Sequence, residues 1–302
     1  MITIFTTAQP FRGRNAVAQR NALRSWQVLH SDVQIMLFGD ADGSQEVAWE
    51  LGIHYEEHPR LTGGDSIRLD HMFAKAQSAA RYTALCYVAC DTILLTDFCQ
   101  AFNRVEALYP EFVMVGRSRN ISGFDLQSFD DLGWERRCWE LAQRQTRQKF
   151  GENIAFIAFS KGLYLNDVPA LPAGTPLAFD WLMRKAITEE VTVVDASEMV
   201  FALRQSCDGG EAGTVDSTRG PTVKISTTRS SQSRLCGFAK VPYRLTSADV
   251  VRNHWQRIRY WRERVQRWLD EALQAWRETA RQFKKTSGLD ATDVFGSESS
   301  RR

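Results

Sequence analysis

Several patterns that would assign a function class are missing from this chain of 302 residues. No apolar stretch approaches the roughly 20 residues that a membrane-spanning helix needs. The initial apolar run, Met1–Thr7, is short and is followed by basic residues, so we expect no signal peptide and a cytoplasmic protein. The net charge of only +2 does not by itself point to nucleic acid or to an anionic membrane as a partner.

Short motifs for metals, redox chemistry and phosphates are also missing. Six cysteines are scattered without a C-x-x-C pair, and we expect them to be reduced. Cys86 and Cys90 lie on or beside an apolar segment, where a thiol behaves as a small hydrophobic group. The five histidines show no spacing typical of zinc ligands. Neither a Walker loop nor a G-x-G-x-x-G motif occurs, and a surface turn explains the segment Thr62–Asp65 better than a phosphate loop does.

The most informative segment that is present is Leu85–Leu95, in which an apolar run is interrupted by Asp91. A continuous apolar run suits a strand at the centre of a mostly parallel sheet, covered on both faces. Ligands bind outside the carboxyl ends of such strands. A carboxylate there can hold Mg²⁺ or Mn²⁺ against a phosphate oxygen. The residue pattern alone leaves an ordinary turn or helix cap as an equal alternative for Asp91.

Apolar strands alternate with amphipathic helices along much of the chain. The expected strands are 2–6, 33–38, 53–55, the segment before Asp91, 112–115, 154–159 and 191–194. The expected helices are 14–29, 44–51, 66–81, 96–108 and 134–150, with another beginning near 179–183, and 116–133 is expected to be irregular. This alternation predicts an α/β fold with a mostly parallel sheet flanked by helices.

The composition divides the chain into four parts. We expect the sheet domain to occupy 1–205. Residues 206–246 are rich in Ser, Thr and Gly and are expected to form a flexible loop and a return segment. Residues 247–286 are expected to form a long amphipathic helix that begins at Ser247, and 287–302 a disordered tail.

The expected C-terminal helix carries tryptophans at helical spacing on a basic background. Between residues 250 and 285, ten Lys and Arg side chains stand against four Asp and Glu. Such a helix can pack on the sheet domain or on a second copy of the chain, which makes a homodimer one interpretation. It can also lie on an anionic membrane surface, which makes peripheral membrane contact the other. No motif supports nucleic-acid binding.

Four short stretches carry a resemblance to a known family. They are Thr6–Phe11 with the following helical segment Asn21–Trp26, then Ile35–Asp40, then Cys86–Phe98, and finally the pair Phe179–Leu182 and Val194–Ala196. In this order and spacing they resemble bacterial glycosyltransferases of the GT-A type, close to the inverting, family-2-like group of nucleotide-diphospho-sugar transferases. The resemblance covers roughly residues 1–205, and no single motif in it is highly specific.

The resemblance implies a Rossmann-like GT-A sheet that binds a nucleotide-diphospho-sugar donor. Asp40 and the end of the first strand would lie near the nucleoside. Asp91 matches the last Asp of the DXD signature and would reach the diphosphate through Mn²⁺ or Mg²⁺. The residues implied in donor binding are Thr6, Thr7, Asp40, Arg68, Asp70, Asp91 and Arg204.

The resemblance also implies the chemistry. Asp180 matches the acidic residue on the acceptor side that usually serves as general base for a hydroxyl acceptor, and the transfer would be inverting. The transition state is expected to be oxocarbenium-like, as in glycoside hydrolysis. From the residues alone, Asp180 could equally be a helix N-cap and Asp40 a turn residue.

Two departures from the family pattern bear on the metal. Ala89 stands where the first acidic residue of the DXD signature would be, and Arg204 lies where a metal-binding His is frequent. An Arg can supply charge to a diphosphate without a metal, so metal dependence is open. The alternative is a non-catalytic nucleotide-sugar-binding or assembly protein on the same fold, tethered by its C-terminal helix. A nucleotidyltransferase is a weaker alternative, because no Gly-rich, Lys-bearing activation loop is seen.

Overall fold

The structure, a computed structural model, describes residues 1–57, 67–122, 125, 129, 131, 133–145, 154–206 and 241–252. The elements in chain order are β1 Ile2–Thr7, α1 Gly13–Gln27, β2 Val33–Phe38, α2 Ser44–Leu51, β3 His54–Glu56, α3 Leu69–Ala79, β4 Ala84–Val88, β5 Thr92–Ile93, α4 Asp97–Leu108, β6 Phe112–Ser122, α5 Trp134–Gln145, β7 Ile154–Ser160, α6 Pro176–Thr188, β8 Thr192–Asp195, β9 Ala202–Ser206, β10 Tyr243–Leu245 and β11 Val250–Arg252.

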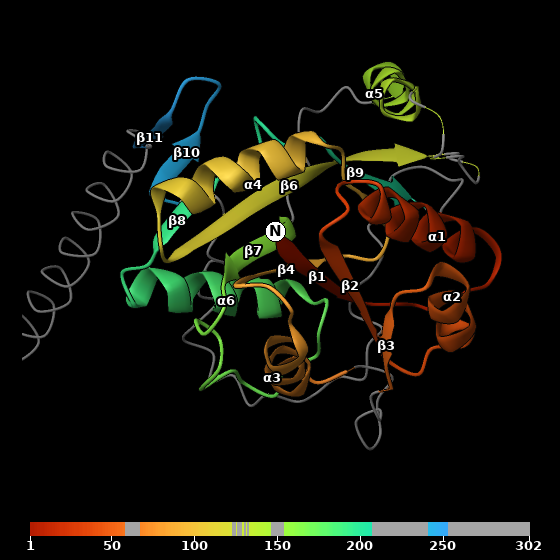
Figure 1. The fold of residues 1–302 in the computed structure, drawn as a ribbon, viewed down its shortest axis with the longest axis horizontal. Coiled ribbons are helices and arrows are strands. Elements are labelled where there is room, and N and C mark those ends of the chain that lie inside the picture. Colours follow the sequence, from red (N-terminus) through yellow and green to blue (C-terminus); the bar gives the residue numbers. More distant parts are fainter. Residues whose placement is uncertain are drawn as a thin grey trace, which may run out of the picture. The chain divides into compact units, whose positions relative to one another are not determined.

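A mixed sheet runs through the described part of the chain in the order β11-β10-β8-β6-β7-β4-β1-β2-β3 (Figure 1). Strands β3, β2, β1 and β4 are parallel to one another. Strand β7 is inserted antiparallel between β4 and β6, after which β6, β8 and β10 are again parallel. The carboxyl ends of β1, β2 and β4 therefore meet at one edge of the sheet.

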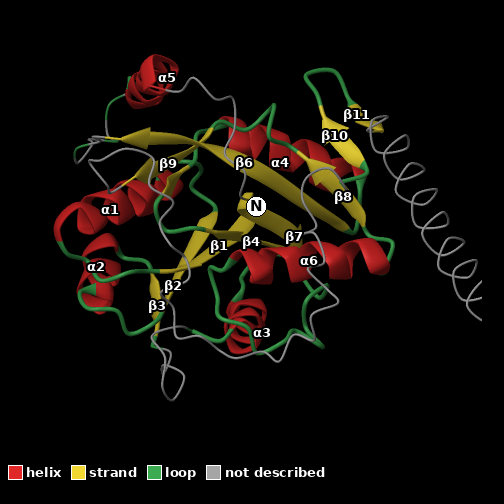
Figure 2. Ribbon diagram, turned by 180° about the vertical axis from the view of Figure 1, so that it is seen from behind, coloured by secondary structure: helices red, strands yellow, loops and turns green. Residues whose placement is uncertain are grey.

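Helices cover both faces of this sheet, because its central strands are apolar on both sides (Figure 2). All five residues of β4 are buried. On one face Ile2 and Ile4 pack in a core with side chains of α1, α2 and α4. On the other face Phe5 and Tyr87 pack in a core with side chains of α3 and α6.

A second, smaller sheet continues from the far end of β6. Strand β9 pairs parallel with residues 118–122 of β6 and antiparallel with β5. Helix α5 covers this sheet through an apolar cluster that contains Ile93, Leu203 and Trp134. The segment directly after β4 is thus tied to a strand that lies more than 100 residues later in the chain.

The α/β fold with a sheet flanked by helices confirms the sequence prediction. One expectation within it was wrong, because β6 extends to Ser122, whereas the sequence predicted a strand of 112–115 and an irregular segment from 116. The extra residues pair with β9, a contact that local sequence patterns do not report. The helices in the described part of the chain are too short or too polar to span a bilayer.

The predicted start of the C-terminal helix at Ser247 was also wrong. Residues 250–252 form β11, which pairs antiparallel with β10. The Thr246 hydroxyl accepts a hydrogen bond from the Asp249 N–H at 3.0 Å and donates one to the Asp249 carbonyl at 2.7 Å. Thr and Asp serve turns as readily as helix caps, which explains the error. The rest of that predicted helix, the tail 287–302 and most of the 206–246 segment lie outside the described residues.

Candidate functional site

Four of the residues singled out in the sequence lie at or just beyond the carboxyl ends of parallel strands. Thr6 and Thr7 end β1, Asp40 follows β2, and Asp91 lies in the turn between β4 and β5. Because β1 is hydrogen-bonded to both β2 and β4, these strand ends are neighbours. This is the edge at which open α/β sheets bind ligands.

The two threonines at the end of β1 have structural contacts. The buried Thr6 hydroxyl donates a hydrogen bond to the Val88 carbonyl at 2.6 Å, which ties β1 to the end of β4. The Thr7 side chain is hydrogen-bonded to the Tyr87 hydroxyl, which also bonds the backbone of Gly174. Burial raises the pKa of Tyr87, so its phenol stays protonated and the contact persists. Thr6 is therefore buried beneath the candidate site, whereas Thr7 is only partly buried.

The backbone at the end of β2 depends on a glycine. Gly39 has a φ of +118°, and a Cβ at this position would lie 2.8 Å from Cδ1 of Ile67. Only glycine satisfies both conditions without strain. Asp40 follows it on the exposed edge, and burial together with the carboxylates of Glu57 and Asp40 raises the pKa of Tyr55. Asp40 is thus accessible beside a phenol, as a ligand at this edge would require.

Asp91 and Arg204 are brought together although they are distant in the sequence. The Arg204 Nε donates a hydrogen bond to Asp91 Oδ2 at 2.9 Å, and the two side chains are 45% and 26% exposed. The backbone carbonyl of Asp91 accepts hydrogen bonds from the Gln205 N–H at 3.1 Å and from its side-chain Nε2 at 3.2 Å. The turn after β4 and the strand β9 therefore form one rigid unit with an exposed Arg at its surface.

The described residues do not fit a divalent metal site at Asp91. Mg²⁺ and Mn²⁺ take several oxygen ligands, of which carboxylates are the usual protein source. Here Ala89 offers no side-chain oxygen, and the Asp91 carboxylate is paired with a guanidinium. Within the described ranges, no group of three or more His, Cys, Asp and Glu side chains is arranged to hold a metal.

Asp180 lies inside helix α6, so its alternative role as an N-cap was wrong. The cap is Thr175, whose side chain accepts a hydrogen bond from the Ala178 N–H at 3.3 Å, and Pro176 follows at the first helical position. Asp180 is 8% exposed, and its Oδ2 is paired with Arg184 Nε at 2.7 Å. The start of α6 is near the ends of β1 and β4, because Gly174 contacts Tyr87.

Arg68 and Asp70 are joined to each other at the start of α3. The guanidinium forms two hydrogen bonds to the carboxylate, one of them from Nε to Oδ1 at 3.0 Å. Arg68 also forms an isolated β-bridge with Pro172, in the segment that leads to α6. Both side chains are partly exposed, so the pair is an accessible polar group at the start of α3.

Sequence reasoning missed a buried polar network behind Asp91. The Asn21 side-chain amide donates hydrogen bonds to the Gln205 Oε1 and to the Asp125 carbonyl, each at 3.0 Å. Gln19, two residues earlier in α1, accepts a hydrogen bond from the Gln9 N–H at 2.7 Å and donates one to the Gln9 carbonyl at 2.9 Å. These amides hold the β1–α1 loop and the Asp91 turn in place. No pattern in the sequence distinguishes them from solvated helix residues.

A second polar cluster, also missed, surrounds the start of α4. Asp97 Oδ2 accepts a hydrogen bond from the Phe201 N–H at 2.9 Å, and the Arg119 guanidinium lies 4.1 Å from the centre of the Phe201 ring. Glu135 of α5 accepts hydrogen bonds from the N–H and hydroxyl of Thr96 at 2.7 and 3.0 Å. Thr96 therefore binds α5 and makes no side-chain cap for α4.

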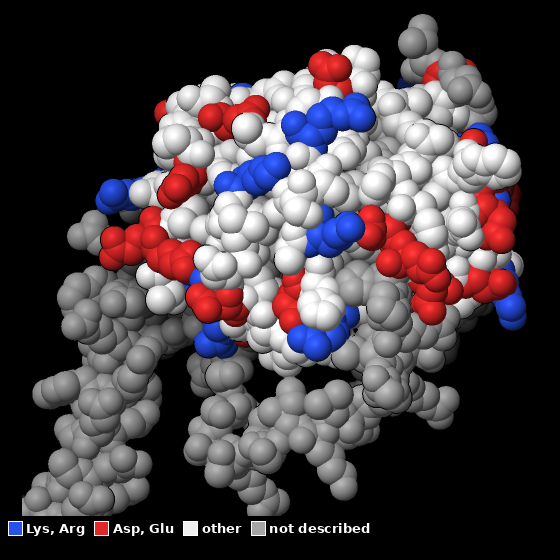
Figure 3. Space-filling view, turned by 60° about the horizontal axis from the view of Figure 1, so that its bottom comes forward, with Lys and Arg blue, Asp and Glu red and all other residues white. Residues whose placement is uncertain are grey.

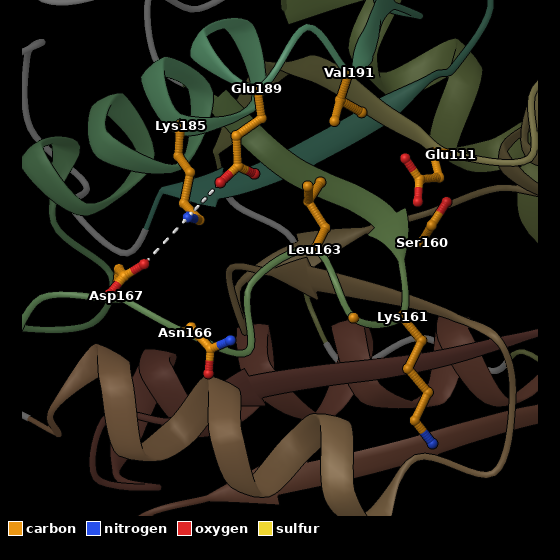
Figure 4. A pocket seen from close by; sticks show the side chains of 10 residues that line it. Glu111, Ser160, Lys161, Leu163, Asn166, Asp167, Lys185, Glu189 and Val191 are labelled. Carbon is orange, nitrogen blue, oxygen red and sulfur yellow. Dashed lines mark hydrogen bonds and ion pairs between the residues drawn. The ribbon is translucent and has the colours of Figure 1, made fainter.

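The described chain also contains a cavity of about 450 Å³ away from this edge. Its lining includes Glu111 before β6, Ser160 at the end of the antiparallel β7 and Val191 before β8. These positions place it at the amino ends of the parallel strands, opposite the Asp91 turn. Figure 4 shows Lys185 directed between Glu189 and Asp167, at distances of 2.7 and 4.0 Å. The cavity therefore shares none of the predicted site residues.

Charge is mixed on the one face of the molecule that Figure 3 shows. Figure 3 shows Lys and Arg side chains interspersed with Asp and Glu on the face that comes forward from the bottom of Figure 1. The face shown in Figure 3 therefore presents no broad basic surface among its described residues.

Comparison with known proteins gives similarity in structure alone. No family model and no curated protein matches the chain. Similar solved structures include S. aureus TarS in complex with UDP, with 9% identity, a TM-score of 0.46, and 68% of this chain and 60% of that chain covered. Another is the M. tuberculosis glucosyl-3-phosphoglycerate synthase with Mg²⁺ and UDP, with 12% identity, a TM-score of 0.40, and 69% and 72% covered.

A third is a mannosyltransferase from Pyrobaculum calidifontis with GDP-Man and Mn²⁺, with 10% identity, a TM-score of 0.44, and 70% and 58% covered. The chain thus spans about 60% of the length of the TarS structure that it matches. The ligands in these structures are UDP, UDP with Mg²⁺, and GDP-Man with Mn²⁺.

Proposed function

We propose that this chain is a glycosyltransferase that moves a sugar from a nucleotide-diphosphate donor to a hydroxyl acceptor, with inversion. The observation that carries the proposal is the Asp91–Arg204 unit, an exposed cation held rigidly at the carboxyl edge of the sheet. Arg204 would bind the diphosphate, and Asp40 and Thr7 would lie toward the nucleoside. Two nucleotide sugars found in similar structures, UDP-GlcNAc and GDP-Man, are the donors to test first, and UDP, also found in one of them, is the nucleotide that transfer from UDP-GlcNAc would release.

The reaction needs a base for the acceptor hydroxyl, and we propose Asp180. The acceptor oxygen attacks the anomeric carbon, the bond from that carbon to the diphosphate oxygen breaks, and the acceptor proton passes to the Asp180 carboxylate. Attack on the face opposite the leaving group inverts the anomeric centre. The leaving diphosphate takes the negative charge, which preorganised donors such as the Arg204 guanidinium stabilise as it develops. Arg184 would orient the Asp180 carboxylate through its contact with Oδ2.

The substitution Asp180→Asn tests this role. It preserves the shape of the side chain but removes the proton acceptor, so we expect transfer to fall by roughly 10²- to 10⁴-fold, with donor affinity little changed. Asp167→Asn is the control, because Asp167 is 86% exposed and lies at the opposite edge of the sheet. Product formation is measured by mass spectrometry with each donor and a panel of hydroxyl acceptors. Transfer by Asp180→Asn at the wild-type rate would exclude Asp180 as the base.

A second candidate function follows from the same site. Ala89 provides no side chain that could coordinate a metal, and the carboxylates of Asp91 and Asp180 both form ion pairs with arginines. These features also suit a nucleotide-sugar-binding or assembly protein without turnover. Donor binding without transfer to any acceptor, and without slow hydrolysis of the donor, would favour this candidate.

A further inference from the structure

We infer that the diphosphate of the donor is neutralised by Arg204 in place of a divalent cation, so that donor binding is independent of metal. This inference rests on the proposed function, because it concerns the same site. It states only which group neutralises the diphosphate. It follows from the hydrogen bonds that the oxygens of the Asp91 turn and the Arg204 guanidinium already make.

The oxygens that a metal would need are occupied by protein donors. Oδ2 of Asp91 accepts from Arg204 Nε at 2.9 Å, and Oδ1 accepts a longer hydrogen bond from the Thr92 hydroxyl at 3.3 Å. The Asp91 carbonyl accepts two hydrogen bonds from Gln205. The Ala89 carbonyl accepts one from the Thr92 N–H at 3.0 Å. A cation at this turn would have to displace several of these donors, and it would then lie beside an arginine of like charge.

The arginine is instead placed as a fixed replacement for the cation. Arg204 lies on β9, whose backbone is paired on both sides, with Thr92 of β5 and with Asn120 of β6. Its Nε donates to Asp91, and the side chain keeps 45% exposure. A guanidinium has five N–H donors in a planar fork, so one edge can be held by Asp91 while the terminal nitrogens meet phosphate oxygens.

This arrangement gives Asp91 a different role from that of a metal ligand. It is a positioning residue, because its carboxylate holds the guanidinium at the edge of the sheet and offsets the charge of Arg204 when no donor is bound. The Gln205 and Asn21 amides behind the turn keep Asp91 itself in place. The whole unit is therefore preorganised for one anionic ligand.

Binding of UDP, GDP, CDP and dTDP to the chain of 302 residues tests the inference by calorimetry, once in EDTA and once with Mn²⁺. We expect one of these nucleotides to bind with the same affinity, within about twofold, in both conditions. In EDTA, Arg204→Gln should weaken that binding by roughly 10- to 100-fold, the loss expected for one or two charge-assisted hydrogen bonds. Arg20→Gln is the matched control, because Arg20 is also paired with an acidic side chain, Glu50 at 2.6 Å, but lies on α1 away from the edge.

A reverse substitution gives a second readout. Ala89→Asp combined with Arg204→Gln restores a second carboxylate and removes the competing cation, so its nucleotide binding should become dependent on Mn²⁺. Circular dichroism confirms that both variants are folded. If the wild-type protein binds a nucleotide only with Mn²⁺, or if Arg204→Gln binds as tightly as wild type, the inference is wrong while the proposed function stands. If none of the nucleotides binds in either condition, the proposed function fails as well.

Discussion

Asp97 is a partly buried carboxyl group whose ionisation is coupled to the fold. Its Oδ2 accepts the Phe201 N–H, whereas its buried Oδ1 has no hydrogen-bond partner in the described structure. Burial raises the pKa of Asp97 from 3.8 to about 6, and the nearby carboxylate of Glu135 adds to the rise. The folded protein therefore keeps at this position a carboxyl group that is more easily protonated than in the unfolded chain.

The sign of the resulting pH dependence is fixed by this difference. Between about pH 4 and pH 6 the native state holds the Asp97 proton more tightly than the unfolded state does, so this residue's contribution to stability falls as the pH rises through that window. Above pH 6 the contribution of Asp97 to stability stays low. The full rise of its pKa corresponds to at most about 3 kcal/mol of unfolding free energy.

Asp97→Asn should therefore change stability in a pH-dependent manner. The Asn carbonyl can still accept the Phe201 N–H, so the variant loses little below pH 4. At pH 7.5 it should be more stable than the wild type by about 1–2 kcal/mol, since it avoids a buried charge. Urea unfolding at several pH values measures the difference between the two proteins, with Asp167→Asn as an exposed control. A difference that does not change between pH 4 and pH 7.5 would show that the ionisation of Asp97 is not its cause.

The residues of the candidate site were predictable only in part. Asp91 was indicated because a carboxylate interrupts an apolar strand, a local pattern. Its pairing with Arg204 joins side chains 113 residues apart, and local patterns carry no information about such a contact. Asn21 and Gln205 could not be predicted at all, since a buried amide and an exposed one look alike in a single sequence.

At the scale of elements, the long central strand β6 contains Gly116, which has the least room for a side chain among the described glycines. Its pairing with β7 shifts register between Gly116 and Arg117, which turns the strand from the main sheet toward the smaller one. At this shift the ring of Phe156 lies directly over Gly116, where a Cβ would come within 2.2 Å of Cε1. The absence of a side chain at 116 therefore lets the Phe156 ring fill the core beside α4, where it contacts Phe98.

Gly116→Ala should destabilise the protein because the Phe156 ring would have to move within a fully packed core. We expect a loss of about 1–3 kcal/mol, as is usual for overpacked sites. Thermal and urea unfolding measure it. The double variant Gly116→Ala with Phe156→Leu should lose less than the sum of the two single variants, since the smaller side chain leaves room for the new methyl group. Strict additivity in this cycle would contradict the proposed clash.

Elements defined by their own sequence were predicted well, and elements defined by partners were not. The strands β1, β2, β4 and β7 are apolar runs, and the structure confirms them with bounds within one or two residues. The outer half of β6 and the strand β11 are mixed sequences that become strands because a partner strand lies beside them. Where the composition of a segment favoured neither a strand nor a loop, pairing with a neighbouring strand thus determined its secondary structure.

At the scale of the whole molecule, the α/β class followed from alternation, but the order of strands did not. The antiparallel insertion of β7 between β4 and β6 joins segments that are not consecutive in the chain. This insertion separates the β1–β4 end of the sheet from the β6–β8 end. Helix α6 contacts β7 and β8 and stacks Phe179 on Tyr87 of β4, whereas β9 pairs with β6. The candidate site exists only where these two halves meet, so no single segment of the sequence contains it.

The segment after β11 can be removed without cutting any described strand of the sheet. Residues 1–252 form one compact unit that ends in a paired strand, so a chain terminated at Arg252 should fold with an unchanged melting temperature. The sequence beyond it predicts a basic helix whose tryptophans share one face, and such a face must be covered. We expect the cover to be a second copy: the full chain should form a dimer by light scattering, and the truncated chain a monomer.

Sedimentation with vesicles that contain anionic lipid distinguishes self-association from the competing interpretation, in which the same face lies on a membrane. Under self-association the full chain stays in the supernatant after centrifugation with these vesicles, and its dimer dissociates on dilution. Self-association would be contradicted if the full chain is monomeric and sediments with anionic vesicles. Salt should then release it, because salt screens the ten basic side chains of residues 250–285. Because the truncated chain keeps the whole candidate site, its nucleotide binding should equal that of the full chain in either case.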